Sequence, residues 1–387
     1  MNFPVKYFHN AQQGAPAVSG TAGSLVAMLD AVLIDGFNTK TFDSLAIASN
    51  VATASISAGA HGFTAGDVIL VNVTSPAALN TEWMVTSVGA NAVLFATSGI
   101  SDQSATGTIT IKIAPVGGWS KIFSATNKAV YKSTDSAASV GRIRVDDTSA
   151  QQAQIRGYEA MTDVDTGTNP VPPSSFSTTY GIVKSSTASS TARNWWVVAD
   201  SRAIHFGIQS NAFSANYFSN MIGDMNTYKA GDAYGFAYAG QTTSTLAQTT
   251  DGIGHYSQFS GRGSTSQSGL YMLRNMNNTG AASLCAKWTS ACGTGGSPGT
   301  NNSVAYPALS DNGVHLHRAY ISDCESQSNG LHQRRGDIPG IYYPEEYQPG
   351  AHLQKITYGG KSYITMSAIV SNSGISSNVF FSLDSWR

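Results

Sequence analysis

Residues 66–113 read GDVILVNVTSPAALNTEWMVTSVGANAVLFATSGISDQSATGTITIKI, and their side chains alternate between apolar and small polar types. This period of two predicts β-strands, because successive side chains of a strand point to opposite faces of its sheet. Gly, Ser, Asn and Pro interrupt the alternation every few residues, as expected for turns. Together with one further strand in SLAIASNVATASIS (residues 44–57), the pattern predicts a small β-barrel or sandwich of about five strands.

The clearest helical pattern of the chain precedes this module, within residues 24–36. Apolar side chains recur there every three or four positions and fall on one helical face. They are Leu25, Met28, Leu29, Val32 and Leu33. Thr21 or Ser24 is placed to cap the start of this helix, and Gly36 suits the left-handed residue that ends one.

After the module, alternating segments continue to the end of the chain and predict a larger, sandwich-like β body. The dipeptide Gly359-Gly360 separates two such segments, and a tight hairpin turn requires a positive φ at both of its central residues. We therefore expect a mainly β protein with a short N-terminal helix. Its expected parts are an N-terminal arm and helix (residues 1–43), a small β-module (residues 44–114) and a main β-rich domain (residues 115–387) that opens with the linker 115–118.

Composition argues against several functional classes. Charged residues make up 12% of the 387 residues and the net charge is −1, about half the charged share of typical soluble domains. Such a chain has no strong field to attract nucleic acid or an anionic membrane surface. Its three cysteines are too few for a disulfide scaffold. No apolar stretch is long enough to span a bilayer, and we expect a chain made in a cytosol.

Motifs for cofactors and metals are weak. The chain has no dinucleotide fingerprint, no H-E-x-x-H and no C-x-x-C, so we expect no cofactor. Asp163-Val-Asp165-Thr-Gly167 has part of a calcium loop but lacks the distal Glu. A zinc site would need several histidines to converge, and the candidates are His315, His317, His332 and His352. We expect no metal site at either place.

Carboxylates and arginines interleave along one stretch of the chain. The carboxylates are Asp146, Asp147, Glu159, Asp163 and Asp165, and the arginines are Arg142, Arg144 and Arg156. We expect these opposite charges to pair across neighbouring strands. A polysaccharide depolymerase would instead use two carboxylates as acid and base, such as Glu159 with Asp146 or Asp163. Because a general acid needs a carboxyl with few partners, we expect no catalytic residues here and no enzyme.

Two groups of apolar side chains are candidates for binding. The first is the helix face of Leu25, Met28, Leu29 and Val32, because a short helix is marginal alone and small residues before it permit close approach of another subunit. The second group is the aromatic pairs Trp195-Trp196 and Tyr342-Tyr343, which could stack on a glycan. Packing inside the chain's own domain is the alternative for both groups.

Several segments, in collinear order, resemble a family of structural proteins of tailed bacteriophages. They include GAPAVSGTAGSL (residues 14–25), HGFTAGD (61–67), WWVVADSRAIHF (195–206), RRGDIPGIYYP (334–344) and the aromatic end FFSLDSWR (380–387). The segment 61–67 and the strands after it are similar to a small β-module that is inserted in many phage virion proteins.

The resemblance implies a structural component of a virion, associated with the tail, the baseplate or a fibre. Its partners would be other virion proteins and copies of itself, with no nucleic acid and no membrane insertion, and the family offers no catalytic residues to carry over. The alternative is a receptor- or glycan-binding protein of the tail tip that takes part in host attachment.

Overall fold

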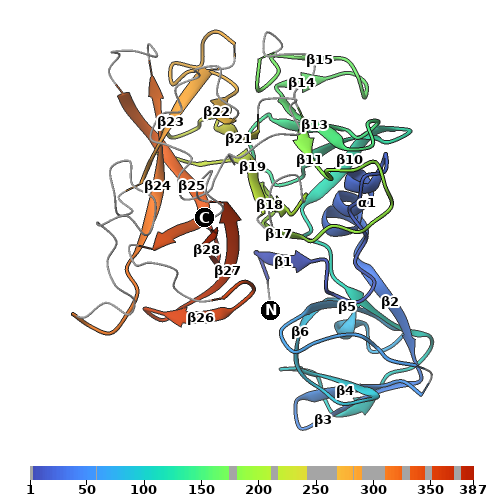
Figure 1. Cartoon of the computed structure of the whole chain (residues 1–387). Coiled ribbons are helices and arrows are strands. Elements are labelled where there is room, and N and C mark those ends of the chain that lie inside the picture. The colour runs from blue at the N-terminus through green and yellow to red at the C-terminus, as the bar shows by residue number, and fades with distance from the viewer. Residues whose placement is uncertain are drawn as a thin grey trace.

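The computed structural model describes residues 3–57, 59–173, 181–210, 217–241, 268–281, 283–289, 310–324, 332–344, 351–369 and 376–387. In this part of the chain, strands predominate, and α1 (Ser24–Asp30) continues into a π-helical turn over Ala31–Asp35 (Figure 1). The mainly β fold with a short N-terminal helix is thus confirmed. No helix among the described residues is long and apolar enough to cross a membrane.

The small module is an eight-stranded antiparallel sheet in the order β2-β9-β5-β6-β7-β4-β3-β8. Its strands are β2 (Phe37–Phe42), β3 (Ser44–Ala48), β4 (Val51–Ser55), β5 (Val68–Asn72), β6 (Glu82–Val88), β7 (Ala92–Ala96), β8 (Gln103–Ser104) and β9 (Ile109–Ile113). The residues of β9 alternate between buried and half-buried, so the period-two pattern marks which side chains face the core.

Two details of the module differ from the sequence prediction. The stretch expected to be one strand is the hairpin β3–β4, because Ser49 and Asn50 have φ values of 51° and 63° and reverse the chain between them. The sheet also includes β2, which pairs with β9 and begins at Phe37, before the expected boundary at residue 44. Separate folding of the module stays a prediction.

The body is built from two larger sheets and a short β-ribbon. One sheet has five strands, β10 (Trp119–Ala125), β11 (Lys128–Ser133), β12 (Arg142–Asp146), β13 (Gln152–Tyr158) and β16 (Ile182–Val183). The ribbon pairs β14 (Ala160–Met161) with β15 (Gly167–Thr168).

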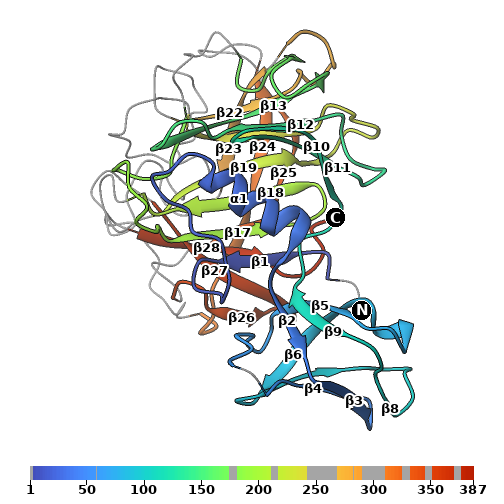
Figure 2. The same ribbon diagram turned by 90° about the vertical axis from the view of Figure 1, so that its right-hand side faces the viewer.

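The other sheet of the body contains 13 described strands. It begins with β1 (Lys6–His9), β17 (Trp195–Ala199), β18 (Ala203–Ile208), β19 (Phe218–Asp224), β21 (Phe236–Gln241) and β22 (Ser268–Met272). It continues with β23 (Ser283–Thr289), β24 (Leu316–Cys324), β25 (His332–Pro344), β28 (Ser376–Ser382), β27 (Lys361–Ile369) and β26 (Lys355–Tyr358), and β20 (Asn226–Thr227) pairs with β25. Figures 1 and 2 show the module below these sheets.

Strands β17 and β18 lie between two cores, and every residue of both is buried. One face of β17, which carries Trp195, packs with α1 and the five-stranded sheet, whereas the opposite face, which carries Trp196, packs with β27 and β28. Trp196 fits because it lies opposite Gly207, where a Cβ would come within 2.4 Å of the indole ring. A strand covered on both faces buries both members of an adjacent aromatic pair.

A buried ion pair holds α1 to the body. The Oδ2 atom of Asp147, just after β12, accepts hydrogen bonds from the backbone N–H of Leu25 (2.7 Å) and Val26 (3.3 Å). Lys184 forms an ion pair with Asp147, and both side chains are fully buried. The Lys184 ammonium also donates to the carbonyl oxygen of Thr21 at 2.7 Å. Asp147 therefore caps the helix from across the fold.

This arrangement corrects two expectations about the helix. No side chain next to the helix caps it, and its N-cap is Gly23 with a φ of 82°, so neither Thr21 nor Ser24 has the predicted role. The proposed assembly contact is also wrong, because the body covers that face. Leu25, Met28, Leu29 and Val32 are at most 2% exposed and belong to the chain's own core.

The glycines predicted at the end of the helix and in the tight hairpin have positive φ values. Gly36 ends the helical segment with a positive φ of 72°, but its ψ of 179° differs from that of the left-handed residue that was expected. Gly359 and Gly360, with φ values of 56° and 74°, join β26 to β27 in a two-residue hairpin. A side chain would be strained in this region of φ, so glycine at these positions marks a turn in the sequence itself.

His205 on β18 is fully buried between aromatic rings. One of its ring nitrogens, Nε2, lies 2.9 Å from the carbonyl oxygen of Pro339, so that nitrogen carries the proton and donates it. The ring centroid lies 4.9 Å from that of Phe381 and 5.4 Å from that of Trp386. Burial, with a smaller effect of the positive charge on Arg387, lowers the pKa of His205 to about 3. The imidazole is neutral in the folded protein at neutral pH.

Replacement of Lys184 by Met tests the buried pair. It leaves Asp147 without its cation, and we expect the free energy of unfolding to fall by about 3–5 kcal/mol, as when one partner of a buried ion pair is removed. Urea unfolding measures the loss. Lys121→Met is the matched control, because Lys121 forms a partly exposed ion pair with Asp30 and its loss should cost at most about 1 kcal/mol. Equal losses in both variants would contradict the assignment.

His205→Gln tests the pH dependence that burial implies. Below its ordinary pKa of 6.5, the unfolded chain takes up a proton at His205, but the folded protein does so only near pH 3. This contribution to stability is complete above pH 6.5 and falls by about 1.4 kcal/mol for each pH unit below it. The Gln amide keeps a donor for Pro339, so the variant should lose less stability than the wild type between pH 6.5 and 4.5. Parallel stability curves would contradict this.

Candidate functional site

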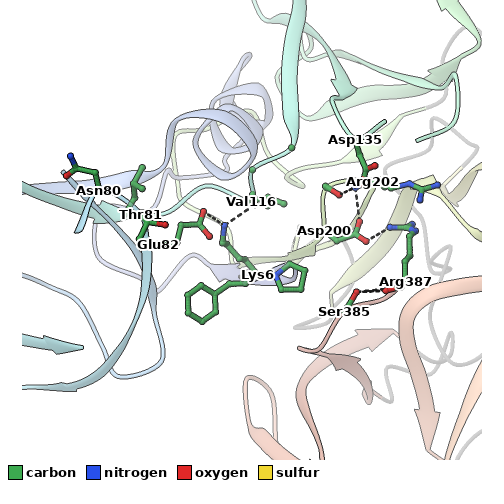
Figure 3. Close-up of a pocket in the computed structure, with 16 residues that line it drawn as sticks. Lys6, Asn80, Thr81, Glu82, Val116, Asp135, Asp200, Arg202, Ser385 and Arg387 are labelled. Atoms are coloured by element: carbon green, nitrogen blue, oxygen red, sulfur yellow. Dashed lines mark hydrogen bonds and ion pairs between the residues drawn. The ribbon is translucent and has the colours of Figure 1, made fainter. Parts of the chain in front are cut away.

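A polar cavity of about 750 Å³ lies where the module meets the body (Figure 3). The module contributes Asn80, Thr81 and Glu82 at the start of β6, and the body contributes the loop between β17 and β18 and the C-terminal residues. The charged side chains that line it are Lys6, Glu82, Asp135, Asp200, Arg202 and Arg387. Ligand pockets are often found where two structural units of a protein meet.

Lys6 on β1 joins three parts of the chain at one wall of the cavity. Its ammonium donates to the Glu82 carboxylate at 2.6 Å, and to the carbonyl oxygens of Pro115 and Val116 at 2.7 and 2.9 Å. The side chain of Lys6 is only 3% exposed, against 26% for Glu82. Burial lowers the pKa of Lys6, and the negative charge of Glu82 opposes that shift. The ammonium thus fastens the module and its linker to the main sheet.

A second charged group forms the opposite wall. The Oδ1 atom of Asp200 accepts the backbone N–H groups of Arg202 (2.8 Å) and Ala203 (2.7 Å), and its Oδ2 atom pairs with Arg387. Arg387 also donates to the carbonyl oxygen of Asp224 at 2.6 Å, and Arg202 pairs with the carboxylate of Asp224 at 2.9 Å. Burial raises the pKa of the Asp200 carboxyl, but the guanidinium of Arg387 and both N–H groups favour its ionised form.

The carboxylates of this cavity are engaged in structural contacts. Asp135 accepts the backbone N–H of Ala137 and the hydroxyl of Ser201, and these bonds hold the pKa of Asp135 below its usual range. Glu82 and Asp200 each pair with a cation. Each of these carboxylates is therefore held by neighbouring donors, an arrangement that is suited to fixing the position of the module or to holding a polar group.

The acidic cluster of the sequence is only partly brought together. Arg144 pairs with Asp146 at 2.9 Å and with Asp165, as expected, and Lys128 also pairs with Asp165, at 2.8 Å. Arg142 instead donates to the carbonyl oxygens of Val140 and Glu159.

Two of the three remaining carboxylates of that cluster, Glu159 and Asp147, lie apart from these pairs, and the third, Asp163, accepts the backbone N–H groups of Asp165 and Thr166. Glu159 forms a two-point ion pair with Arg274, which holds the pKa of Glu159 below its usual range. Asp147 caps α1. A pairing of Glu159 with Asp146 or Asp163 for glycoside hydrolysis requires a protonated acid, and Arg274 opposes protonation of Glu159.

The histidines noted in the sequence lie in different settings. The Nε2 atom of His315 lies 3.3 Å from the Asp311 carboxylate, and burial lowers the pKa of His352 to about 4. The side chain of His332 lies outside the described residues. Among those that are described, no three His, Cys, Asp or Glu side chains are placed to hold a metal ion.

The aromatic pairs expected to stack on a glycan are mostly in the core. Trp195, Trp196 and Tyr343 are completely buried. Strand β17 is covered on both faces, and Tyr343 lies on the face of β25 that packs in the second core. That expectation was wrong for these three residues. Tyr342 is half-buried and meets Tyr363 edge to face at 5.4 Å.

Sequence reasoning missed the residues that line the cavity. Lys6, Asp200 and Arg387 belong to no catalytic or ligand-binding motif, and 381 positions separate the first from the last. The available signal was that few charges occur in this chain and that Lys6 and Asp200 sit beside strongly apolar strand residues. A charge in such a setting is rarely buried unless it is paired.

Comparisons with known proteins were made on sequence and on structure. No family model matches the chain, and no curated protein matches it. Among solved structures, it is similar to the phage phi92 endosialidase with 11% sequence identity and a TM-score of 0.17, over 90% of this chain and 52% of that chain. The chain therefore spans about half the length of that endosialidase. The comparisons assign it to no family.

Lys6→Met tests the joint between the module and the body. Without the ammonium, the carbonyl oxygens of Pro115 and Val116 lose a donor, and we expect stability to fall by about 1–3 kcal/mol and cleavage within residues 115–118 to accelerate. Limited proteolysis followed by mass spectrometry measures the second effect. Lys112→Met is the control, because Lys112 also donates to a carbonyl, that of Asp35, but in an exposed place. Equal cleavage rates in both variants would contradict the role of Lys6.

Proposed function

We propose that this chain is a structural component of a bacteriophage virion, placed at the tail, the baseplate or a fibre. The observation that carries the proposal is the domain architecture. A small β-module is joined to a larger β body by Lys6, which donates to the Glu82 carboxylate and to the carbonyl oxygens of residues 115 and 116. A joint in which a buried lysine pairs with Glu82 and two backbone carbonyl oxygens limits reorientation of the module, which suits a part that must keep its shape in an assembly. The resemblance of collinear sequence segments to phage structural proteins supports the same role.

The expected partners are other virion proteins and further copies of the chain. The module exposes apolar side chains at Val51, Met84 and Val88, which are 37–42% exposed. Val51 and Val88 lie on β4 and β6, on either side of β7, and the module sheet ends in the open edge strands β2 and β8. Unpaired edge strands of a sheet and exposed apolar side chains are both common at protein–protein interfaces.

A receptor- or glycan-binding role at the tail tip is the alternative function. The aromatic pairs named from the sequence do not support it, because most of them are buried. Two arginine side chains on β24 and β25, each about half exposed, and the exposed ring of Tyr228 beside them do support it, and they are described in the next subsection.

Particle composition tests the structural role. We expect the chain to co-purify with complete particles of the phage that encodes it, at a constant ratio to the other tail proteins, and to remain after a high-salt wash. Quantitative mass spectrometry of gradient-purified particles measures the ratio. Recovery of the chain only in the soluble fraction of the lysate would overturn the proposal.

Enzyme assays test the expectation that the acidic cluster is structural. The purified chain should release no reducing ends from the surface polysaccharide of the host. Asp165→Asn should lower stability by at most about 1 kcal/mol, because Asp165 is half exposed in its pairs with Lys128 and Arg144. Glu159→Gln is the matched active-site control. Hydrolysis that Glu159→Gln abolishes in a folded protein would overturn the expectation.

A further inference from the structure

Six side chains form what we call the arginine–tyrosine face of the main sheet: Tyr228, Arg318, Tyr320, Arg334, Asp337 and Tyr342. The paired strands β24 and β25 place them together, because Tyr320 lies opposite Asp337 and Arg318 lies opposite Tyr342. Residues that are directly opposite in an antiparallel pair share one side of the sheet. Tyr228 joins this face from the segment after β20, which pairs with β25.

Stacking on tyrosine rings orients both guanidinium groups. The Arg334 guanidinium carbon lies 3.4 Å from the ring centroid of Tyr320 and 4.8 Å from that of Tyr228. For Arg318 the corresponding distance to the ring of Tyr342 is 5.6 Å. Such stacking limits the rotamers of a long side chain, so the two guanidinium groups are pre-organised.

Asp337 holds the two arginines on either side of one carboxylate. Its Oδ2 atom is 3.3 Å from Arg318 and its Oδ1 atom is 3.6 Å from Arg334, and the Tyr228 hydroxyl donates a hydrogen bond to Oδ1. The side chain of Asp337 is only 6% exposed, whereas those of Arg318 and Arg334 are 49% and 53% exposed. The face thus presents two cations and hides its one anion.

We propose that the arginine–tyrosine face binds a carboxylate-bearing polysaccharide. A planar guanidinium donates two parallel hydrogen bonds to a carboxylate, and both arginine side chains here are about half exposed. Tyrosine rings provide rigid apolar surfaces against which the C–H faces of a sugar can pack, and Tyr228 is 49% exposed. The residues follow two long strands, so an extended polymer can place successive sugars along them.

Charge favours this ligand over nucleic acid. Two arginines that share one aspartate give the face a local charge of about +1, and the whole chain has a net charge of −1. Nucleic-acid binding draws its affinity from the neutralisation of about 6–10 phosphates, which this face cannot provide. A carboxylated polysaccharide has one charge on each acidic sugar and offers apolar sugar faces between the charges.

The proposal makes the alternative, glycan-binding function specific, and it is tested on the purified full chain. The probe is a galacturonic acid oligosaccharide, with its methyl ester as the matched neutral ligand, and isothermal titration calorimetry measures binding. We expect the acid to bind at least tenfold more tightly than the ester, with an affinity that falls as salt rises. Equal affinity for acid and ester, or no binding of either, overturns the proposal and leaves the particle test of the structural role unaffected.

Four variants locate the site. Arg318→Gln combined with Arg334→Gln should weaken binding of the acid at least tenfold. The control, Lys40→Gln in the module, should change the affinity for the acid less than twofold. Asp337→Asn removes the competing carboxylate and should tighten binding several-fold, an effect that mere loss of structure does not produce. Arg334→Lys keeps the charge but not the planar fork, and it should give an intermediate loss. Equal effects of the Arg and Lys40 substitutions, or weaker binding in a folded Asp337→Asn protein, overturn the assignment.

Discussion

The buried ion pair between Asp147 and Lys184 is the interaction on which the arrangement of the helix and the sheets depends. The carboxylate caps α1, the ammonium holds the chain before the helix, and both side chains are fully buried. Neither charge could stay in the core alone, because an unpaired buried ion costs several kcal/mol. The folded protein therefore requires the N-terminal arm, the five-stranded sheet and the segment after β16 to be in place together. With α1 in place, its apolar face closes the core that lies against β17.

Buried pairs of opposite charges also occur elsewhere in the body. Only 12% of residues are charged, yet several of them are buried in pairs rather than spread over the surface. Arg335 makes a two-point ion pair with Asp232 in the interior, at 3.0 and 3.1 Å. Arg335 is also the first residue of an Arg-Gly-Asp sequence, and its burial, with that of Asp337, keeps this tripeptide from acting as an exposed adhesion signal. Buried polar contacts of this kind favour one arrangement of strands over others.

The two proposed roles, assembly and glycan binding, use different parts of the molecule. The joint at Lys6 fixes the module, and the open edges and exposed apolar side chains of the module are suited to neighbours in a particle. The arginine–tyrosine face lies on β24 and β25, strands of the main sheet rather than of the module. A protein that is built into a particle by one part can present another part to a host surface, so the two proposals are compatible.

The sequence alone determined the local structure. Period-two alternation located most strands, a three-to-four spacing located the helix, and Gly359-Gly360 located a hairpin, because each of these depends on neighbouring residues and on allowed φ values. It did not determine which faces are covered. Trp195 and Trp196 read as a candidate stacking pair, but strands β1 and β18 beside them and cores on both sides bury both rings.

Only the tertiary structure decided the partners of the charges and the candidate site. Asp147 lies 122 positions from Leu25, whose N–H it accepts, and no local pattern encodes such a distance. Lys6, Asp200 and Arg387 meet because β1 and the chain's last residues reach the same end of β17. Burial and ion pairing depend on what covers a residue in space, whereas periodicity records only which way its side chain points.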